Sequence, residues 1–308
     1  LRALGDVRYE AKAMIYSQLL TFLIGATALL FDAPVVVLLF AFLVSSALNA
    51  LYSATQLRKR FAVRIRLSYD RVQRATFLRL AYPFALSALF ARIATFADTL
   101  LLQKLLGSAE LGTYSIAHKV STAFQFIPLA LMAGLYPAFS RSWTKSTKGD
   151  GVFQKLFYDA FTYLLLLIMP IACGIATLAR PLLTIFDERY VASTLALQLL
   201  MGAVVCNFVF YLTGAALNAC NRQATQTRIV FGMMVCTIVL DVLLISFWGT
   251  VGAAAAALIA QGCAAITGVL FVRSIAGIRL RALTSIALRV MIACIAMVAV
   301  VYTLTQHM

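Results

Sequence analysis

The chain has 308 residues, of which 63% are hydrophobic and 12% charged, and its mean hydropathy is +0.93. Soluble domains carry about 25% charged residues, so this composition excludes a soluble globular protein and indicates an integral membrane protein. The formal net charge is +15, but the basic residues lie almost entirely in short loops between apolar runs. That distribution is typical of membrane topology and argues against a nucleic-acid partner.

Apolar runs of about 20 residues, each long enough to cross a bilayer, predict an all-α helix bundle with about nine transmembrane helices. In chain order we expect them at Ala13–Phe31, Pro34–Leu57, Leu80–Leu105, Thr113–Ser140, Leu156–Ala179, Ser193–Asn218, Arg228–Phe247, Gly252–Val272 and Ile286–Thr305.

The loops between these helices alternate in charge. One set holds 21 of the 26 lysine and arginine residues, including eight in the loop Arg58–Arg79. By the positive-inside rule this set is cytoplasmic, which predicts a cytoplasmic N-terminus and a C-terminus on the outer side of the membrane. The loop Arg58–Arg79 is either a topology signal and linker or a segment that lies against anionic membrane lipids. The outer loop Arg180–Ala192 is typical of a short interfacial amphipathic helix.

Polar residues recur at helical spacing on several of the predicted spans, which places them on one face of each helix. Such stripes either line an aqueous cavity or hydrogen-bond one helix to another. Because charged residues occur among them, we favour the cavity. The candidate substrate-binding residues on these stripes are Asn49, Arg92, Thr95, Thr99, Gln125, Asn207 and Asn218.

The predicted hairpin of the third and fourth spans carries four charged or titratable residues at a cost of a few kcal/mol or more each. With its turn near Ala109, Asp98 lies at about the depth of Lys119 and His118. Either one of these residues forms a structural ion pair with Asp98, which we favour, or Lys119 extends to the outer membrane interface. Arg92 is deeper, at about the depth of Gln125, and has no opposite charge there. Its planar guanidinium suits a phosphate, so Arg92 is the main candidate for contact with an anionic substrate.

The sequence contains no phosphate loop, no metalloprotease motif and no nucleophile elbow, so we expect no catalytic residues, no metal and no cofactor. The six cysteines show no metal or disulfide spacing. Asp241 is either a cation ligand or a carboxylate satisfied near a helix end, and we favour the second interpretation.

From the third span onward the chain resembles the polysaccharide flippases, the O-antigen and capsule exporters of the multidrug/oligosaccharidyl-lipid/polysaccharide exporter superfamily. The order and spacing of several short motifs carry this resemblance. They are Tyr82-Pro83, Asp98-Thr99, Leu106-Gly107, Glu110-Leu111-Gly112, Tyr136-Pro137, Arg180-Pro181-Leu182-Leu183, Leu217-Asn218-Ala219 and Gly249-Thr250-Val251-Gly252.

The resemblance implies a transporter with two six-helix lobes that exports an oligosaccharide on an undecaprenyl-pyrophosphate carrier by alternating access across the bacterial inner membrane. The C-terminus would then be periplasmic. Polysaccharide polymerase and glycosyltransferases are then expected partners. Residues 1–57 would be the last two helices of an N-terminal lobe whose first helices are missing, and 58–79 the basic inter-lobe loop. Residues 80–272 would be the six-helix C-terminal lobe, and 273–308 a loop with an extra helix. The resemblance also implies an asparagine at position 241, where this chain has Asp241.

Other functions stay open at this point. A drug/cation antiporter of the same fold would use cavity carboxylates, and a lipid II-type flippase would share the lipid carrier. A membrane-embedded glycosyltransferase or polymerase would need a longer external loop than Arg180–Ala192. The basic candidates in the predicted cavity favour an anionic substrate.

Overall fold

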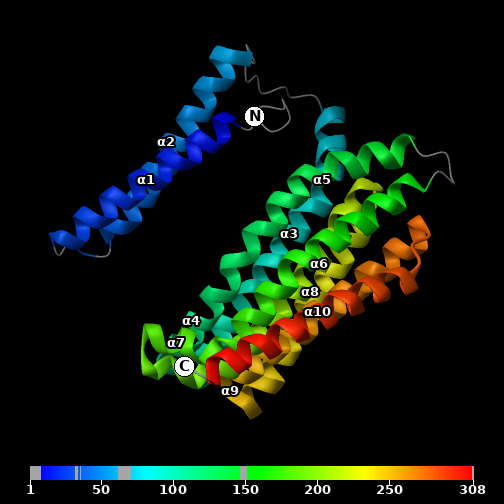
Figure 1. Ribbon diagram of the computed structural model, residues 1–308. Coiled ribbons are helices and arrows are strands. Elements are labelled where there is room, and N and C mark those ends of the chain that lie inside the picture. The colour runs from blue at the N-terminus through cyan, green and yellow to red at the C-terminus, as the bar shows by residue number, and fades with distance from the viewer. Residues whose placement is uncertain (1–7, 32–33, 35, 62–70, 146–150, 307–308) are drawn as a thin grey trace. The chain divides into compact units, whose positions relative to one another are not determined.

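The computed structural model describes residues 8–31, 34, 36–61, 71–145 and 151–306, and within these ranges it contains helices and turns but no strand (Figure 1). The predicted all-α fold is confirmed. The chain divides into two compact units, Leu1–Arg74 and Ala75–Met308. The helices are α1 (Arg8–Leu30), α2 (Val36–Phe61), α3 (Arg71–Leu106), α4 (Ser108–Thr122), α5 (Phe126–Lys145), α6 (Val152–Thr177), α7 (Ala179–Phe186), α8 (Thr194–Ala219), α9 (Gln223–Ala276) and α10 (Leu280–Gln306), with short 3₁₀ turns η2 (Ala123–Gln125) and η3 (Glu188–Ser193).

The first unit is an antiparallel pair of helices. The Thr21 hydroxyl of α1 donates to the Ser45 hydroxyl of α2 at 2.8 Å. One end of the pair is joined by an edge-to-face contact between Tyr16 and Tyr52, whose ring centroids lie 6.1 Å apart. Thr21 also donates to the Ser17 carbonyl of its own helix at 2.9 Å, so the bond to Ser45 adds a polar contact between the two apolar helices and helps to fix their register.

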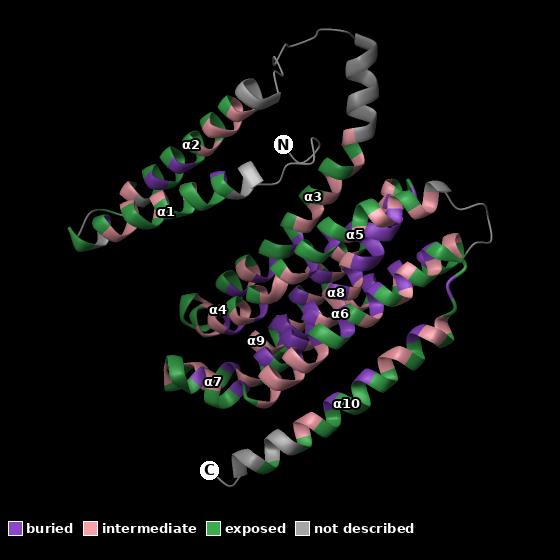
Figure 2. Ribbon diagram, turned by 45° about the horizontal axis from the view of Figure 1, so that its top comes forward, coloured by how far each residue is buried: buried purple, intermediate pink, exposed green. Residues whose placement is uncertain are grey.

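The second unit is built around α8, which packs against α4, α5, α6 and α9. Figure 2 shows that its buried residues concentrate on these central helices. Small residues allow α8 and the second half of α9 to approach closely: a side chain at Gly202 would meet Leu258, and one at Gly268 would meet Thr213. These matched positions show that the two segments run parallel.

The helix α9 folds back on itself at Gly249. This residue has φ 57° and ψ −132°, a backbone conformation open essentially to glycine alone. Residues 223–248 and 250–276 then form an antiparallel hairpin, since Gly232 and Cys236 of the first half line the same small pocket as Cys263 and Thr267 of the second. This hairpin accounts for the two separate spans predicted at Arg228–Phe247 and Gly252–Val272.

The helix α3 lies alongside the first half of α9, and the two run parallel. The Thr227 hydroxyl donates to the Pro83 carbonyl at 2.9 Å. Further along, the rings of Phe90 and Phe231 lie 5.0 Å apart. This pairing sets which α3 side chains face the core of the unit.

The predicted span Thr113–Ser140 is interrupted in the structure, where the 3₁₀ turn η2 separates α4 from α5. Pro128 explains the interruption, because it has no N–H to donate to the carbonyl of Phe124 four residues earlier. A tightened turn therefore precedes the proline, and Gln125 lies in that turn.

All nine predicted spans overlap observed helices, and six helices of the described ranges have the length and composition to cross a membrane. The chain is therefore a multi-pass membrane protein. The predicted amphipathic segment Arg180–Ala192 is also helical, as α7 and η3, with Leu183 buried and Ile185 exposed. Beyond α7, the Arg189 side chain donates to Asp187 and holds the pKa of that exposed carboxyl below its usual range.

Candidate functional site

Arg92 lies near the middle of the α3 span Ala81–Leu106, and its side chain is exposed. Among the described residues it has no hydrogen-bond or carboxylate partner. Its guanidinium lies within electrostatic range of Tyr211 on α8. An arginine at this depth is costly against lipid, so its position favours a water-filled or substrate-filled space between α3 and α8.

Two further polar residues lie one helical turn from Arg92 and from Tyr211. Thr95, one turn beyond Arg92, is exposed and donates its hydroxyl to the Ala91 carbonyl at 2.8 Å. On α8, Asn207 lies one turn before Tyr211, and its buried side-chain oxygen has no hydrogen-bond partner within the described part of the chain. The Arg92 guanidinium supplies N–H donors, and the Asn207 side-chain oxygen is a free acceptor within the described residues. Such donors and acceptors suit an anionic substrate that carries hydroxyl groups.

The structure does not gather all the predicted site residues around Arg92. Thr99 is half-buried two turns further along α3, and Asn218 is half-buried near the end of α8. Gln125 is half-buried in η2, and no hydrogen bond joins it to Arg92 within the described ranges. Asn49 lies on α2 of the first unit, whose position relative to the second is not determined.

A second polar group forms where α3, α4 and α9 meet. Asp98, Tyr114 and Asp241 lie within electrostatic range of one another and are 7%, 1% and 0% exposed. In the described chain, one oxygen of Asp98 and both oxygens of Asp241 are buried without a hydrogen-bond partner, and the buried Tyr114 hydroxyl lies close to the Asp98 carboxylate. Unpaired buried polar atoms each cost about 1–3 kcal/mol. Stability alone therefore does not explain why Asp98, Tyr114 and Asp241, together called the acidic trio, are buried here.

The predicted ion pair of Asp98 with Lys119 or His118 does not form in the described part of the chain. Lys119 is exposed, and the His118 ring packs against Tyr114 at a centroid distance of 5.8 Å. The reason is the position of the turn, which we expected near Ala109. The helix break lies instead at Gly107, where φ is 88°. Moving the centre of a hairpin by about two residues moves the opposite residue by about four, from Lys119 towards Tyr114.

The interpretation of Asp241 as a satisfied helix-end carboxylate is wrong. The Asp241 side chain, on the first half of α9, is fully buried and lies within electrostatic range of Asp98. Two facing carboxylates in a low-dielectric interior repel each other unless they share a proton or enclose a cation. No group of three or more His, Cys, Asp and Glu side chains that could hold a metal occurs among the described residues. The trio therefore fits a proton or a small monovalent cation better than a transition metal.

The sequence did not single out Tyr114, and at Asp241 it favoured a carboxylate satisfied near a helix end. The signal that could have found the trio is spacing. Leu106-Gly107-Ser108 sets the turn, and an aspartate in the middle of the apolar run 228–247 is costly at membrane depth.

Comparison with known families identifies the class of protein. The profile of the family described as MatE matches residues 83–248, more than half of the chain. The profile described as Polysaccharide biosynthesis protein matches residues 2–143. The chain therefore belongs to the MatE family, within the multidrug/oligosaccharidyl-lipid/polysaccharide exporter superfamily, and the predicted membership of that superfamily is confirmed. The family and the fold are those of transporters and flippases.

One curated relative is a probable low-salt glycan biosynthesis flippase of Haloferax volcanii, 24% identical over 160 residues. That alignment covers 52% of this chain and 34% of the relative, so the chain spans about a third of that protein's length.

Three solved structures show the same fold. An inward-facing multidrug resistance MATE transporter gives a TM-score of 0.74 at 17% identity, covering 91% of this chain and 66% of that one. A mutant of the Vibrio cholerae MATE transporter VcmN gives 0.71 at 17%, covering 89% and 63%. The lipid II flippase MurJ, in an inward closed conformation, gives 0.67 at 16%, covering 93% and 59%. This chain spans about three fifths to two thirds of these proteins.

Proposed function

We propose that the chain takes part in moving a lipid-linked oligosaccharide, carried on undecaprenyl pyrophosphate, across the plasma membrane by alternating access. The observation that carries the proposal is Arg92, a cation near the middle of a membrane span that has no carboxylate partner among the described residues and lies within electrostatic range of Tyr211. A pyrophosphate is the natural anionic partner for an arginine fork at this depth. The match to the polysaccharide biosynthesis family and the glycan flippase relative support the same substrate class.

On this proposal residues 80–272 form the C-terminal lobe of the transporter, and residues 1–57 belong to the preceding lobe. The basic loops 58–79 and 141–155 face the cytoplasm, where the glycan is built on its carrier. Glycosyltransferases would supply the loaded carrier and a polysaccharide polymerase would consume it. The products would be surface polysaccharides such as O-antigen or capsule.

Arg92→Ala tests the proposed substrate contact. In cells that depend on the intact gene for surface polysaccharide, Arg92→Ala should abolish complementation at unchanged protein level, while Arg92→Lys should retain part of it because the charge persists without the fork. Arg180→Ala, an exposed arginine of α7 in the predicted outer loop, is the matched control and should complement fully. Full complementation by Arg92→Ala would overturn the assignment of this site.

A second candidate function is a cation-coupled antiporter of the same fold. The acidic trio favours it, because facing carboxylates at membrane depth are suited to take up and release a proton or a small cation. The trio is compatible with both candidates, since a flippase could draw on the same ion gradient for its cycle. An unpaired cation at Arg92 is the feature that favours an anionic over a cationic substrate. A lipid II-type flippase stays within the same substrate class.

A further inference from the structure

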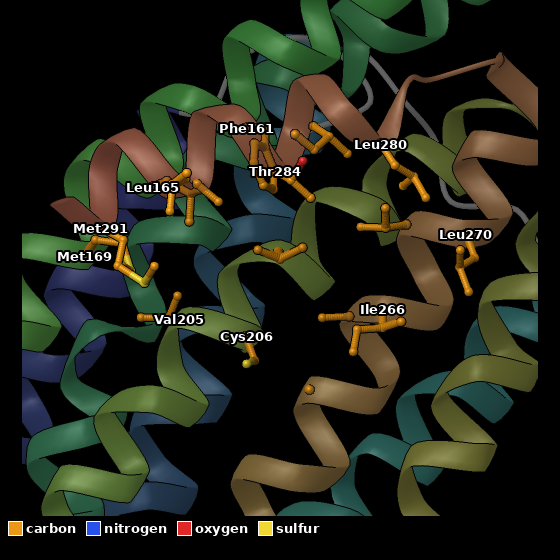
Figure 3. Close-up of a pocket in the computed structure, with 17 residues that line it drawn as sticks. Phe161, Leu165, Met169, Val205, Cys206, Ile266, Leu270, Leu280, Thr284 and Met291 are labelled. Carbon is orange, nitrogen blue, oxygen red and sulfur yellow. The ribbon is translucent and has the colours of Figure 1, made fainter.

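An apolar pocket of about 600 Å³ lies between α6, α8, the second half of α9 and α10 (Figure 3). Phe161, Val205, Ile266 and Met291 come from these four helices and point into it. The lining contains no charged side chain, and Thr284 supplies its one hydroxyl. No residue of α3, α4 or the first half of α9 lines the pocket, so it is separate from Arg92 and from the acidic trio.

The pocket opens to the membrane and not to water. Ile266 and Met291 on its rim are 63% and 44% exposed, and both lie within membrane-spanning segments. The helix α10 packs on α6, so the space beside α8 and α9 stays open beneath it. A pocket of this size at membrane depth, lined by aliphatic and aromatic carbon, is filled by a hydrocarbon chain.

One end of the pocket is fixed in place by polar contacts. The backbone N–H of Arg279 donates to the Tyr158 hydroxyl at 2.6 Å, and the Gln154 amide donates to the Ala276 carbonyl at 2.8 Å. These bonds attach the connection between α9 and α10 to the first turns of α6. Gly277, with φ 68°, ends α9 and allows the chain to turn there.

That end is also strongly basic. Leu280 and Leu283 line the pocket, and the exposed Arg279 and Arg281 flank Leu280. The same end of the bundle carries exposed basic side chains on α6 and α9 and one exposed carboxylate on α6; these are Lys155, Arg273 and Asp159. Cations outnumber the carboxylate four to one. An apolar slot that ends at a group of cations is complementary to a lipid with an anionic headgroup.

We propose that this pocket is a binding site for an anionic glycerophospholipid, with an acyl chain between α6, α9 and α10 and the phosphate against Arg279 and Arg281. The basic loops place this end in the cytoplasmic leaflet by the positive-inside rule. Because the pocket is separate from the polar space at Arg92, its lipid is a resident of the bundle and not the transported molecule. The bound chain fills the gap that α10 leaves beside α8 and α9.

Native mass spectrometry of the purified chain, titrated with defined lipids, tests the proposal. Phosphatidylglycerol should bind more tightly than phosphatidylcholine with the same acyl chains. Each arginine near an anionic group is expected to contribute about fivefold in affinity. The double variant Arg279→Ala/Arg281→Ala should therefore weaken phosphatidylglycerol binding by about 25-fold, and phosphatidylcholine binding by much less, because the choline group offsets the phosphate charge. Arg222→Ala, an exposed arginine in the loop between α8 and α9, is the matched control.

A pocket-filling variant separates the chain site from the headgroup site. Ala287→Trp places a ring in the pocket and should abolish retained phosphatidylglycerol, whereas Ala293→Trp on an exposed face of α10 should not. Equal binding of both phospholipids to the unmodified chain would overturn the proposal. So would binding that neither the double arginine variant nor Ala287→Trp changes. Displacement of phosphatidylglycerol by equimolar polyprenyl phosphate would assign the pocket to the carrier lipid and also overturn it.

Discussion

The substitution Gly268→Ala tests the close packing of α8 against the second half of α9. A Cβ at position 268 would overlap the Thr213 hydroxyl and lie 2.9 Å from Thr213 Cβ. Carbon atoms pack best at about 3.5–4.0 Å. Thr213 is fully buried and its Cβ is attached to the backbone, so the two helices must separate.

Two opposing contributions determine how Gly268→Ala changes the free energy of unfolding. Overpacking of a well-packed interface costs about 1–3 kcal/mol. Replacing glycine by alanine inside a helix returns about 1 kcal/mol of helix propensity. We expect Gly268→Ala to lower the free energy of unfolding by about 1 kcal/mol, and the melting temperature in detergent by about 3 °C. Gly232→Ala is the matched control, because no atom lies within 4 Å of its added Cβ. That variant should raise the melting temperature.

The assay is thermal unfolding in detergent, followed by the loss of the monodisperse peak in size-exclusion chromatography. Adding Thr213→Ala to Gly268→Ala should recover part of the loss, because the overlapping hydroxyl is removed while Cβ remains. A Gly268→Ala protein as stable as Gly232→Ala would refute the proposed parallel packing of α8 and the second half of α9.

Two further predictions concern the acidic trio and the position of α10. Asp241→Asn removes one of two facing carboxylates, so the variant should be more thermostable than the parent. Added Na⁺ or protons should raise the melting temperature of the parent more than that of the variant. Equal responses of the two proteins would argue against a cation or proton at the trio. Cys173 of α6 and Cys294 of α10 lie within interaction range, so mild oxidation with copper phenanthroline should join them, as read by mass spectrometry after proteolysis. Cys220, at the end of α8, should stay unlinked, and failure of Cys173 and Cys294 to cross-link would contradict the packing of α10 on α6.

The membrane spans could be predicted because a bilayer imposes one strong requirement, about 20 apolar residues for each helix. This requirement located the two halves of α9 from sequence alone, whereas α7 was located by the amphipathic pattern of Arg180–Ala192. The interruption at η2 was harder to foresee, since the apolar run Thr113–Ser140 continues through Pro128 and predicts a single span. Helix ends are set by single residues such as Gly107, and a small error there propagates along both arms of a hairpin.

The acidic trio shows how an error in the position of a helix end changes the predicted contacts. Asp98 was correctly identified as a costly charge, but its partner depends on the register of α4 against α3, which hydropathy does not determine. Asp241 lies 143 residues away in sequence, and only the fold brings the two carboxylates together. The apolar pocket gave no sequence signal, because Ile266 and Met291 are typical of any helix surface that faces lipid.

We propose that the protein carries a lipid-linked glycan from the cytoplasmic to the outer leaflet. The most direct test compares right-side-out and inverted membrane vesicles from cells with and without the gene, using a membrane-impermeant probe for the glycan. In the deletion, lipid-linked glycan should accumulate and be labelled in inverted vesicles, with surface polysaccharide reduced. Normal surface polysaccharide, with the glycan labelled equally from both sides as in the parent cells, would contradict the claim.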